Sequence, residues 1–148
     1  MFKFLDKLYG FDIDGAADTA SALCPVFYDE EVINAFDQRP QHHVIWCNPP
    51  YGGLGPWMDL FAAWGKSNVV VALVPAAPDT VWWKRGADTA TETILLSPGR
   101  VQFVDPETGA PAKNNTTAST LFIYDPLWPP VEGMRRMDVW DWRRDVFD

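Results

Sequence analysis

The sequence is poor in cysteine, histidine and basic residues, and it contains no long apolar run. Its two cysteines, Cys24 and Cys47, are too few for a disulfide framework, and with His42 and His43 they match no zinc-ligand spacing. No apolar segment approaches the ~20 residues that a membrane helix needs, and the N-terminus lacks the apolar core and cleavage site of a signal peptide. We therefore expect a cytoplasmic protein that has no metal site and no membrane partner.

The shortage of positive charge is marked, because 12 Lys and Arg residues stand against 20 Asp and Glu residues, for a net charge of −8. Since phosphate contacts need Lys and Arg, this balance excludes strong non-specific affinity for nucleic acid. It does not exclude nucleic acid as a weakly held, salt-sensitive substrate, because basic residues can gather on one face. The candidates are Lys84-Arg85, Arg100, Lys113, Arg135-Arg136 and Arg143-Arg144.

The length of 148 residues and the apolar content of 47% indicate a single globular domain with its own core. A strand at 44–47, a helix at 56–64 and a strand at 69–74 together predict a βαβ unit. The remaining patterns predict helices at 2–9 and 81–90, and strands at 11–13, 26–28, 92–97, 100–104 and 119–124. Alternating strands and helices of this kind are typical of an α/β fold.

The central feature is a β-prone run, residues 44–47, that leads directly into Asn48-Pro49-Pro50-Tyr51. Because proline has no N–H, the strand must end here and leave a stiff platform at its carboxyl end, where α/β sheets bind ligands. The Asn48 side-chain oxygen and the Pro49 carbonyl are acceptors, and Tyr51 offers a flat face for stacking. Such a platform can hold a planar ring that bears an NH2 group and keep the nitrogen lone pair available for attack on an electrophile.

The tetrapeptide Asn48-Pro49-Pro50-Tyr51 resembles the catalytic motif of amino-methyltransferases, whose pattern is Asp/Asn/Ser-Pro-Pro-Tyr/Phe/Trp. The flanks resemble the phage-type DNA N-6-adenine methyltransferases (Dam-like), through Trp46-Cys47, Gly52, Trp57, Val74-Pro75-Ala76, Asp79-Thr80 and Trp82-Trp83. The resemblance extends from about Leu5 to Tyr124. It implies a Rossmann-like, S-adenosylmethionine-dependent methyltransferase fold, with a mostly parallel sheet and an antiparallel C-terminal edge.

The resemblance also implies residues that bind S-adenosyl-L-methionine. The family has a Phe-x-x-Asp-x-Ala-Ala-like stretch, matched by Asp14 and Ala16, and Asn48 borders the same site. Asp29 follows the strand at 26–28, the position at which an acid binds ribose hydroxyls in nucleotide folds. An alternative stays open for both acids, because Asp14 can belong to a strand before a capped helix and Asp29 can cap a helix over 30–36.

The implied reaction is methyl transfer to adenine N6 of a base flipped out of DNA, with catalysis by Asn48 to Tyr51 and stacking by Tyr51. Trp82 and Trp83, which belong to the resemblance, and the basic residues Lys84 and Arg85 that follow them are further candidates for contact with substrate, although one of the two tryptophans is expected to pack inward. Cytosine N4 and protein glutamine are alternative acceptors. The family's Trp-x-Thr-Pro-like segment before the first helix has no counterpart here, so a weak cofactor site or a catalytically lost binding module is a further alternative.

The domain prediction places a minimal catalytic domain at 1–125 and a C-terminal tail at 126–148, beyond the resemblance. Aromatic and basic residues interleave in the tail, which is a pattern that can grip nucleic acid. Four aspartates, Asp138, Asp141, Asp145 and Asp148, nearly cancel its arginines. A docked helix or a self-association segment is therefore favoured, with a homo-oligomer as the expected consequence. The loop at 105–117 either reaches over the substrate or lies on the surface.

Overall fold

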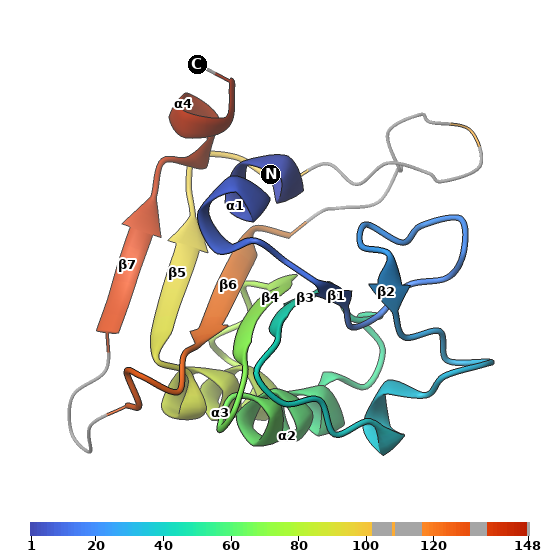
Figure 1. The fold of residues 1–148 in the computed structure, drawn as a ribbon. Coiled ribbons are helices and arrows are strands. Elements are labelled where there is room, and N and C mark those ends of the chain that lie inside the picture. The colour runs from blue at the N-terminus through green and yellow to red at the C-terminus, as the bar shows by residue number, and fades with distance from the viewer. Residues whose placement is uncertain (102–107, 109–116, 131–135, 148) are drawn as a thin grey trace.

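The computed structural model describes residues 1–101, 108, 117–130 and 136–147. Its helices are α1 (Phe2–Tyr9), α2 (Leu54–Trp64), α3 (Val81–Thr89) and α4 (Trp142–Phe147), with a short 3-10 helix, η1 (Ala35–Asp37). Its strands are β1 (Ile13–Asp14), β2 (Val26–Phe27), β3 (Val44–Cys47), β4 (Val69–Pro75), β5 (Glu92–Leu96), β6 (Ser119–Tyr124) and β7 (Arg136–Trp140) (Figure 1). The expected mixed α/β architecture is confirmed.

The strands of the described residues form one sheet in the order β2-β1-β3-β4-β6-β5-β7. Strands β2, β1, β3 and β4 run parallel to one another, and β7 runs parallel to β5. Strand β6 lies antiparallel between β4 and β5. The expectation of a mostly parallel sheet with an antiparallel portion towards its C-terminal side is therefore confirmed.

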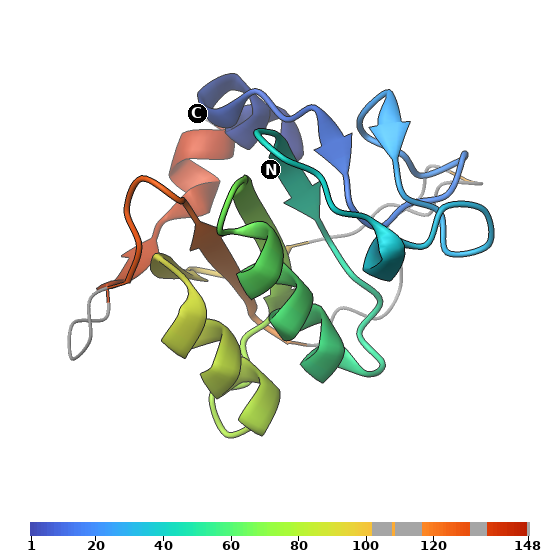
Figure 2. The ribbon, with the colours of Figure 1, turned by 60° about the horizontal axis from the view of Figure 1, so that its bottom comes forward.

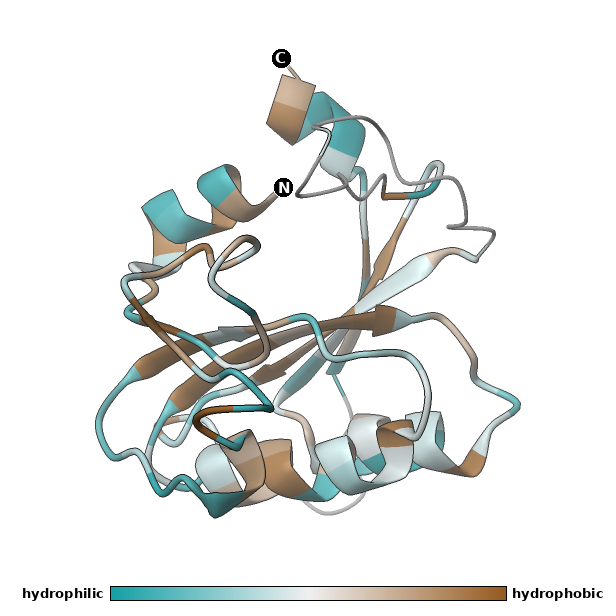
Figure 3. Cartoon of the chain, turned by 90° about the vertical axis from the view of Figure 1, so that its right-hand side faces the viewer, coloured by the Kyte–Doolittle hydropathy of each residue, from teal (hydrophilic) through white to brown (hydrophobic). Residues whose placement is uncertain are grey.

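Helices cover both faces of the sheet, so the molecule has three layers (Figure 3). Helices α2 and α3 lie side by side on one face, whereas α1 and α4 lie on the other (Figure 2). The alternation within β6 shows this division, because Phe122 packs in the core on the α2 and α3 side and Leu121 in the core on the α1 and α4 side. The two ends of the chain meet where the ring of Phe4 stacks on that of Trp140, with 5.5 Å between centroids.

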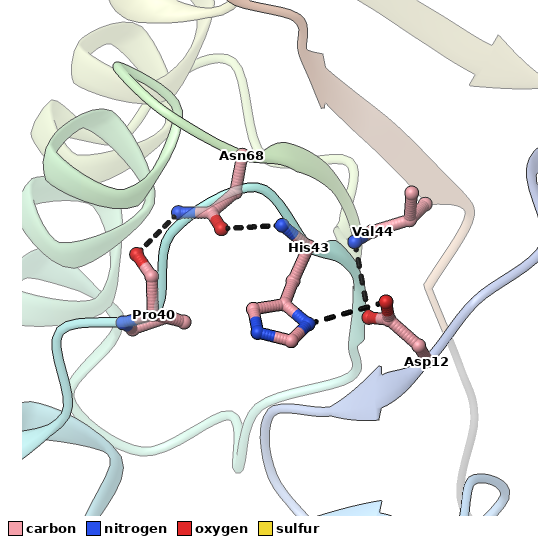
Figure 4. Close-up of polar contacts among 5 residues, drawn as sticks. All are labelled: Asp12, Pro40, His43, Val44 and Asn68. Carbon is pink, nitrogen blue, oxygen red and sulfur yellow. Dashed lines mark hydrogen bonds and ion pairs between the residues drawn. The ribbon is translucent and has the colours of Figure 1, made fainter.

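A buried asparagine ties the amino end of β3 to the end of α2 (Figure 4). The side-chain oxygen of Asn68 accepts a hydrogen bond from the His43 N–H at 2.9 Å, and its Nδ2 donates to the carbonyls of Pro40 at 2.9 Å and Trp64 at 2.8 Å. The fully buried amide thus satisfies its own polar groups and those of the chain around it.

Asp12 adds a second tie at the same end of the sheet, between the segment before β1 and β3. One carboxylate oxygen accepts a hydrogen bond from the Val44 N–H at 3.1 Å, and the other lies 3.2 Å from His43 Nδ1 (Figure 4). This cluster fixes β3 at its amino end. The platform at the carboxyl end of β3 therefore extends from an anchored strand.

Three details differ from the prediction. The helix expected over 30–36 is absent, and this segment instead forms a turn that is followed by η1. Val32 and Ile33 in this segment are exposed, so the apolar side chains that would form the buried face of such a helix do not pack against the core. Arg100 and Val101 are not in a strand, and the rest of the strand expected over 100–104 lies outside the described residues. Strand β7 was not predicted.

In the described part of the chain, no helix is long and apolar enough to cross a membrane.

Candidate functional site

A pocket of about 870 Å³ opens at the carboxyl ends of β1, β2 and β3. The chain runs from β1 to its neighbour β2 on one side and then crosses to β3 on the other side of β1. The strand order therefore reverses between β1 and β3, and open α/β sheets bind ligands at such a point. The lining residues are 15–18, 28–31, 34–36, 48–52 and Trp57.

The predicted platform forms one wall of this pocket. All four residues of the motif, Asn48-Pro49-Pro50-Tyr51, line it, and the Pro49 ring is fully buried. The Asn48 Oδ1 atom is buried and has no hydrogen-bond partner among the described residues. A buried acceptor without a donor typically costs about 1–3 kcal/mol, so in native proteins such an atom calls for an explanation, such as a catalytic role or an ordered water or ion. Asn48 therefore brings to the pocket wall a side-chain acceptor that no described residue satisfies.

Tyr51 lies on the same wall with 39% of its surface exposed. Burial of the rest of the side chain raises the pKa of its hydroxyl to about 12, so the phenol is neutral over the physiological range. The side chain therefore contributes an aromatic ring and a neutral hydroxyl to the pocket. Gly53 follows with φ 78°, a left-handed conformation that lets the chain turn from the motif into α2.

Asp14 does not line the pocket, in contrast to its predicted contact with a cofactor. Its buried carboxylate accepts hydrogen bonds from the N–H groups of Ala16 at 3.3 Å and Leu23 at 3.0 Å. Burial raises the pKa of Asp14, and these two backbone hydrogen bonds oppose the shift. The structure thus gives Asp14 the role of shaping the loop after β1, whereas Ala16 in that loop does line the pocket.

Asp29 lines the pocket, and three further carboxylates, those of Asp18, Glu30 and Glu31, lie with it. Its predicted contact with ribose hydroxyls stays a prediction. Among the described lining residues there is no lysine or arginine. The Asp29 carboxylate also accepts a hydrogen bond from the Glu31 N–H at 2.9 Å, so it caps a turn in place of the expected helix. A pocket with this lining favours cationic and hydroxyl-rich ligands over phosphates.

An aromatic pair at the pocket was missed by sequence reasoning. Phe36 and Trp57 both line the pocket, and their rings meet edge to face with centroids 4.8 Å apart. The Asn34 side chain fixes this segment by accepting a hydrogen bond from the Phe36 N–H at 2.9 Å. The sequence pattern places Trp57 in the core stripe of its helix and Phe36 in a helix that does not form. No local pattern shows that the two rings meet.

The predicted substrate residues of α3 do not reach the pocket. Trp83 is buried, its Nε1 donates a hydrogen bond to Thr120 Oγ1 at 3.1 Å, and its ring packs against Phe122. It is therefore the tryptophan that packs inward, and we do not retain it as a substrate contact. Trp82 is partly buried and packs against the same core.

The two basic residues of α3 form ion pairs on the surface. Lys84 Nζ lies 2.6 Å from Asp88 Oδ2, one turn further along the helix. Arg85 Nη1 lies 3.3 Å from Asp59 Oδ2 and links α3 to α2. Neither residue lines the pocket, so the structure does not bring them together with Tyr51. Their predicted contact with substrate stays a prediction.

The fold and the pocket define an open α/β protein with a ligand site at its topological switch point and an Asn-Pro-Pro-Tyr wall. The sequence matches the family described as DNA N-6-adenine-methyltransferase (Dam) over residues 1–144, and the chain belongs to that family. The predicted resemblance is confirmed. Its expected end near Tyr124 is wrong, because the match also includes β7 and part of α4.

Two relatives are similar over most of the chain. A protein of Escherichia phage T1 called DNA N-6-adenine-methyltransferase is 27% identical, over 83% of this chain and 58% of its own length. A protein of Haemophilus phage HP1 (strain HP1c1) with the same description is 25% identical, over 87% of this chain and 76% of its own length. The chain thus spans only 58% of the length of the phage T1 relative.

Proposed function

We propose that this chain is an S-adenosylmethionine-dependent DNA methyltransferase that acts on adenine N6 of a flipped-out base. The observation that carries the proposal is the buried Oδ1 of Asn48, a residue that lines the pocket next to Tyr51, because this acceptor has no hydrogen-bond partner among the described residues. The amino group of a target base is a donor that would satisfy it. Membership of the DNA N-6-adenine-methyltransferase (Dam) family and the names of the two phage relatives support adenine as the base.

We propose that the sheet is the Rossmann-like sheet of such methyltransferases. The four parallel strands with a switch point between β1 and β3 support this assignment, as does the reversed strand β6. The loop after β1 and the turn after β2 both open onto the pocket, as the nucleotide-binding segments do in α/β sheets. Most of the fold thus serves to bring these loops beside the tetrapeptide.

The residues present fit S-adenosylmethionine. A pocket of about 870 Å³ falls in the range of small-molecule sites. The carboxylate of Asp29 suits ribose hydroxyls, and the acidic lining suits a ligand that carries a sulfonium and an ammonium group. The rings of Phe36 and Trp57 offer an apolar surface to a planar base. When bound, the cofactor supplies an electrophilic methyl group.

The chain's own contribution is alignment of the acceptor nitrogen. Asn48 Oδ1 and the Pro49 carbonyl accept hydrogen bonds from the two amino protons, which directs the N6 lone pair towards the methyl group. Tyr51 stacks on the base, a contact worth roughly 1–3 kcal/mol. Because an asparagine side chain cannot take up a proton, Asn48 would hold N6 as a neutral amino group. A bound cofactor would supply the methyl group, with the S–CH3 bond breaking as the N–CH3 bond forms, and N6 would then lose a proton to water. The rate gain comes from positioning.

We expect such an enzyme to bind DNA weakly, and its affinity falls as salt rises because the contacts that do form join Lys or Arg to phosphates. The net charge of −8 and the four carboxylates at the pocket oppose the approach of phosphates. The target base must leave the duplex to reach the platform. The cost of unstacking is offset by the contacts that the extruded base makes with Asn48 and Tyr51.

The test is methyl transfer from labelled S-adenosylmethionine to DNA that lacks prior methylation, followed by digestion to nucleosides. The proposal predicts label in N6-methyl-2′-deoxyadenosine. Label in N4-methyl-2′-deoxycytidine would show that cytosine is the acceptor, and label in a glutamine of added protein would show that the substrate is a protein. Absence of transfer together with absence of cofactor binding would support the catalytically lost alternative.

A further inference from the structure

Strand β7 ends the sheet, and its neighbour among the described residues is β5 alone. The Ser97 N–H donates a hydrogen bond to the Trp140 carbonyl at 3.0 Å, so the backbone of Trp140 faces β5. Because alternate residues of a strand direct their N–H and C=O groups to opposite sides, Asp138 faces β5 as well. Met137 and Val139 therefore direct theirs outward, away from the sheet.

The side chains of these two outward residues are apolar and exposed. Met137 is 53% exposed and Val139 is 66% exposed. Val139 lies opposite Leu95, which packs against the core under α2 and α3, so the two side chains continue that apolar face beyond the helices. An edge strand with unpaired backbone groups and apolar side chains is a template for pairing with another strand.

We propose that β7 pairs antiparallel with β7 of a second copy, about a two-fold axis that passes through Met137. The interface is isologous, so each contact occurs twice. In this register Arg136 lies opposite Asp138 of the partner subunit, and Asp138 lies opposite Arg136 of the partner subunit. The strand is thus complementary in charge to itself. This proposal is independent of the methyltransferase activity.

Both the backbone and the charges select this register. The outward Met137 pairs with Met137 of the partner subunit as a hydrogen-bonded pair, which makes the flanking positions non-hydrogen-bonded pairs. Side chains approach most closely in such pairs, and opposite charges there stabilise the sheet. A register centred on Asp138 would place two aspartates face to face, and one centred on Val139 would form no Arg–Asp pair.

Arg136 can form an ion pair with Asp138 of the partner subunit because its side chain is 72% exposed. Within its own chain its Nε lies 3.4 Å from Glu92 Oε1 and 3.9 Å from Asp138 Oδ2. In the dimer each arginine therefore lies between Glu92 of its own chain and Asp138 of the partner subunit. The arginine gains a carboxylate partner without losing Glu92.

The dimer leaves the pocket open. In the order of the sheet, β7 is separated from β3 by β5, β6 and β4. Antiparallel joining also turns the carboxyl edges of the two sheets in opposite directions. Each pocket therefore faces away from the other, and a single short duplex cannot engage both.

The test is sedimentation velocity of the full chain over about a hundredfold range of protein concentration. The range should extend from below to above the dissociation constant of a weak dimer. The proposal predicts a reversible monomer–dimer equilibrium. Arg136→Asp and Asp138→Arg each place like charges opposite one another and weaken the dimer by about tenfold or more. The double variant restores opposite charges and recovers dimerisation. A monomer at every concentration, or a folded double variant that stays monomeric, would overturn the proposal.

Two further variants test the edge and the register separately. Met137→Pro removes the outward N–H on the axis and leaves the ladder to β5 intact, so the folded protein becomes monomeric, whereas Met137→Leu keeps the N–H and dimerises. Met137→Cys places two thiols on the axis with their Cα atoms about 5.5 Å apart, so a short thiol-to-thiol bifunctional reagent joins the two chains. A Met137→Pro dimer, or a Met137→Cys dimer that this reagent does not join, would exclude this interface.

Discussion

The N–H of Gly15 donates a hydrogen bond to the Trp46 carbonyl, with 2.7 Å between the two atoms. This bond joins the first residue after β1 to the strand that carries Asn48. The loop that lines one side of the pocket and the motif that lines the other therefore start from adjacent points of the sheet. The proposed reaction depends on that proximity, because the cofactor and the base must meet between the two.

Gly15 is expected to resist replacement by a larger residue. A Cβ atom at this position would lie 3.2 Å from Cys47 Sγ and 3.2 Å from Trp64 Cζ3. We expect Gly15→Val to lower the free energy of unfolding by about 2 kcal/mol, because both neighbours lie in the packed core. A Cβ atom at Gly52, also at the pocket, would meet nothing within 4 Å, so Gly52→Val is the matched control. Urea denaturation of the two variants checks the difference, and equal stabilities would contradict it.

Removal of the Thr120 hydroxyl is expected to destabilise the core. Thr120→Val leaves the Trp83 Nε1–H buried without its acceptor, which typically costs about 1–3 kcal/mol. The double variant Trp83→Phe with Thr120→Val removes both partners, so its loss of stability should be smaller than the sum of the losses of the two single variants. Thermal unfolding of the single and double variants measures the coupling. Additive effects would show that the hydrogen bond contributes nothing.

Asp14 and Asp18 are expected to give stability opposite dependences on pH. Burial raises the folded-state pKa of Asp14, so the folded protein holds this proton more tightly than the unfolded chain does. The contribution of Asp14 therefore falls as pH rises from its unfolded pKa, about 3.9, through its raised folded pKa. The pKa of Asp18 is lowered, first by the Ser21 hydroxyl, so its contribution is present above the unfolded pKa and is lost as pH falls through the folded pKa.

Denaturation of Asp14→Asn and Asp18→Asn at a series of pH values shows whether the two stability contributions change in opposite directions with pH. Relative to each variant, the unsubstituted chain should become less stable with rising pH for Asp14 and more stable for Asp18. The same slope in both comparisons would show that burial does not govern Asp14.

Loss of the Asn48 acceptor is expected to remove activity without removing stability. Asn48→Ala deletes a buried oxygen that has no partner among the described residues, so no hydrogen bond within that part of the chain is lost. We expect an almost unchanged melting temperature, nearly intact cofactor affinity, and a fall in methyl transfer of about a hundredfold or more. Tyr51→Ala should behave in the same way through loss of stacking. Loss of cofactor affinity in both variants would assign these residues to the cofactor side.

The elements set by local signals were predictable from the sequence. Residues 44–47 form the expected strand because prolines end it, and α1 ends at Gly10, which has a φ of 68°. The Thr80 hydroxyl caps α3, which was predicted at 81–90, by accepting a hydrogen bond from the Trp83 N–H. Each of these signals acts within a few residues of the chain. They sufficed to place the tetrapeptide at the carboxyl end of a parallel strand.

Features that depend on distant parts of the chain were not predictable. The Asp14 carboxylate accepts a hydrogen bond from the Leu23 N–H, a contact that the sequence around β1 does not reveal. Phe36 and Trp57 meet only because η1 and α2 face the same pocket. Strand β7 has alternating charged and apolar residues, but its place beside β5 depends on the whole sheet. In each case tertiary contacts decide between local alternatives.

The most direct test of the proposed cofactor site is calorimetric titration of the full chain with S-adenosylhomocysteine, alongside the Asp29→Ala variant. We expect saturable binding at one site per chain, and weaker binding to the variant, because Asp29 lines the pocket. Absence of binding at about millimolar ligand, where even a weak site would be occupied, would contradict the proposal. The pocket would then belong to another ligand.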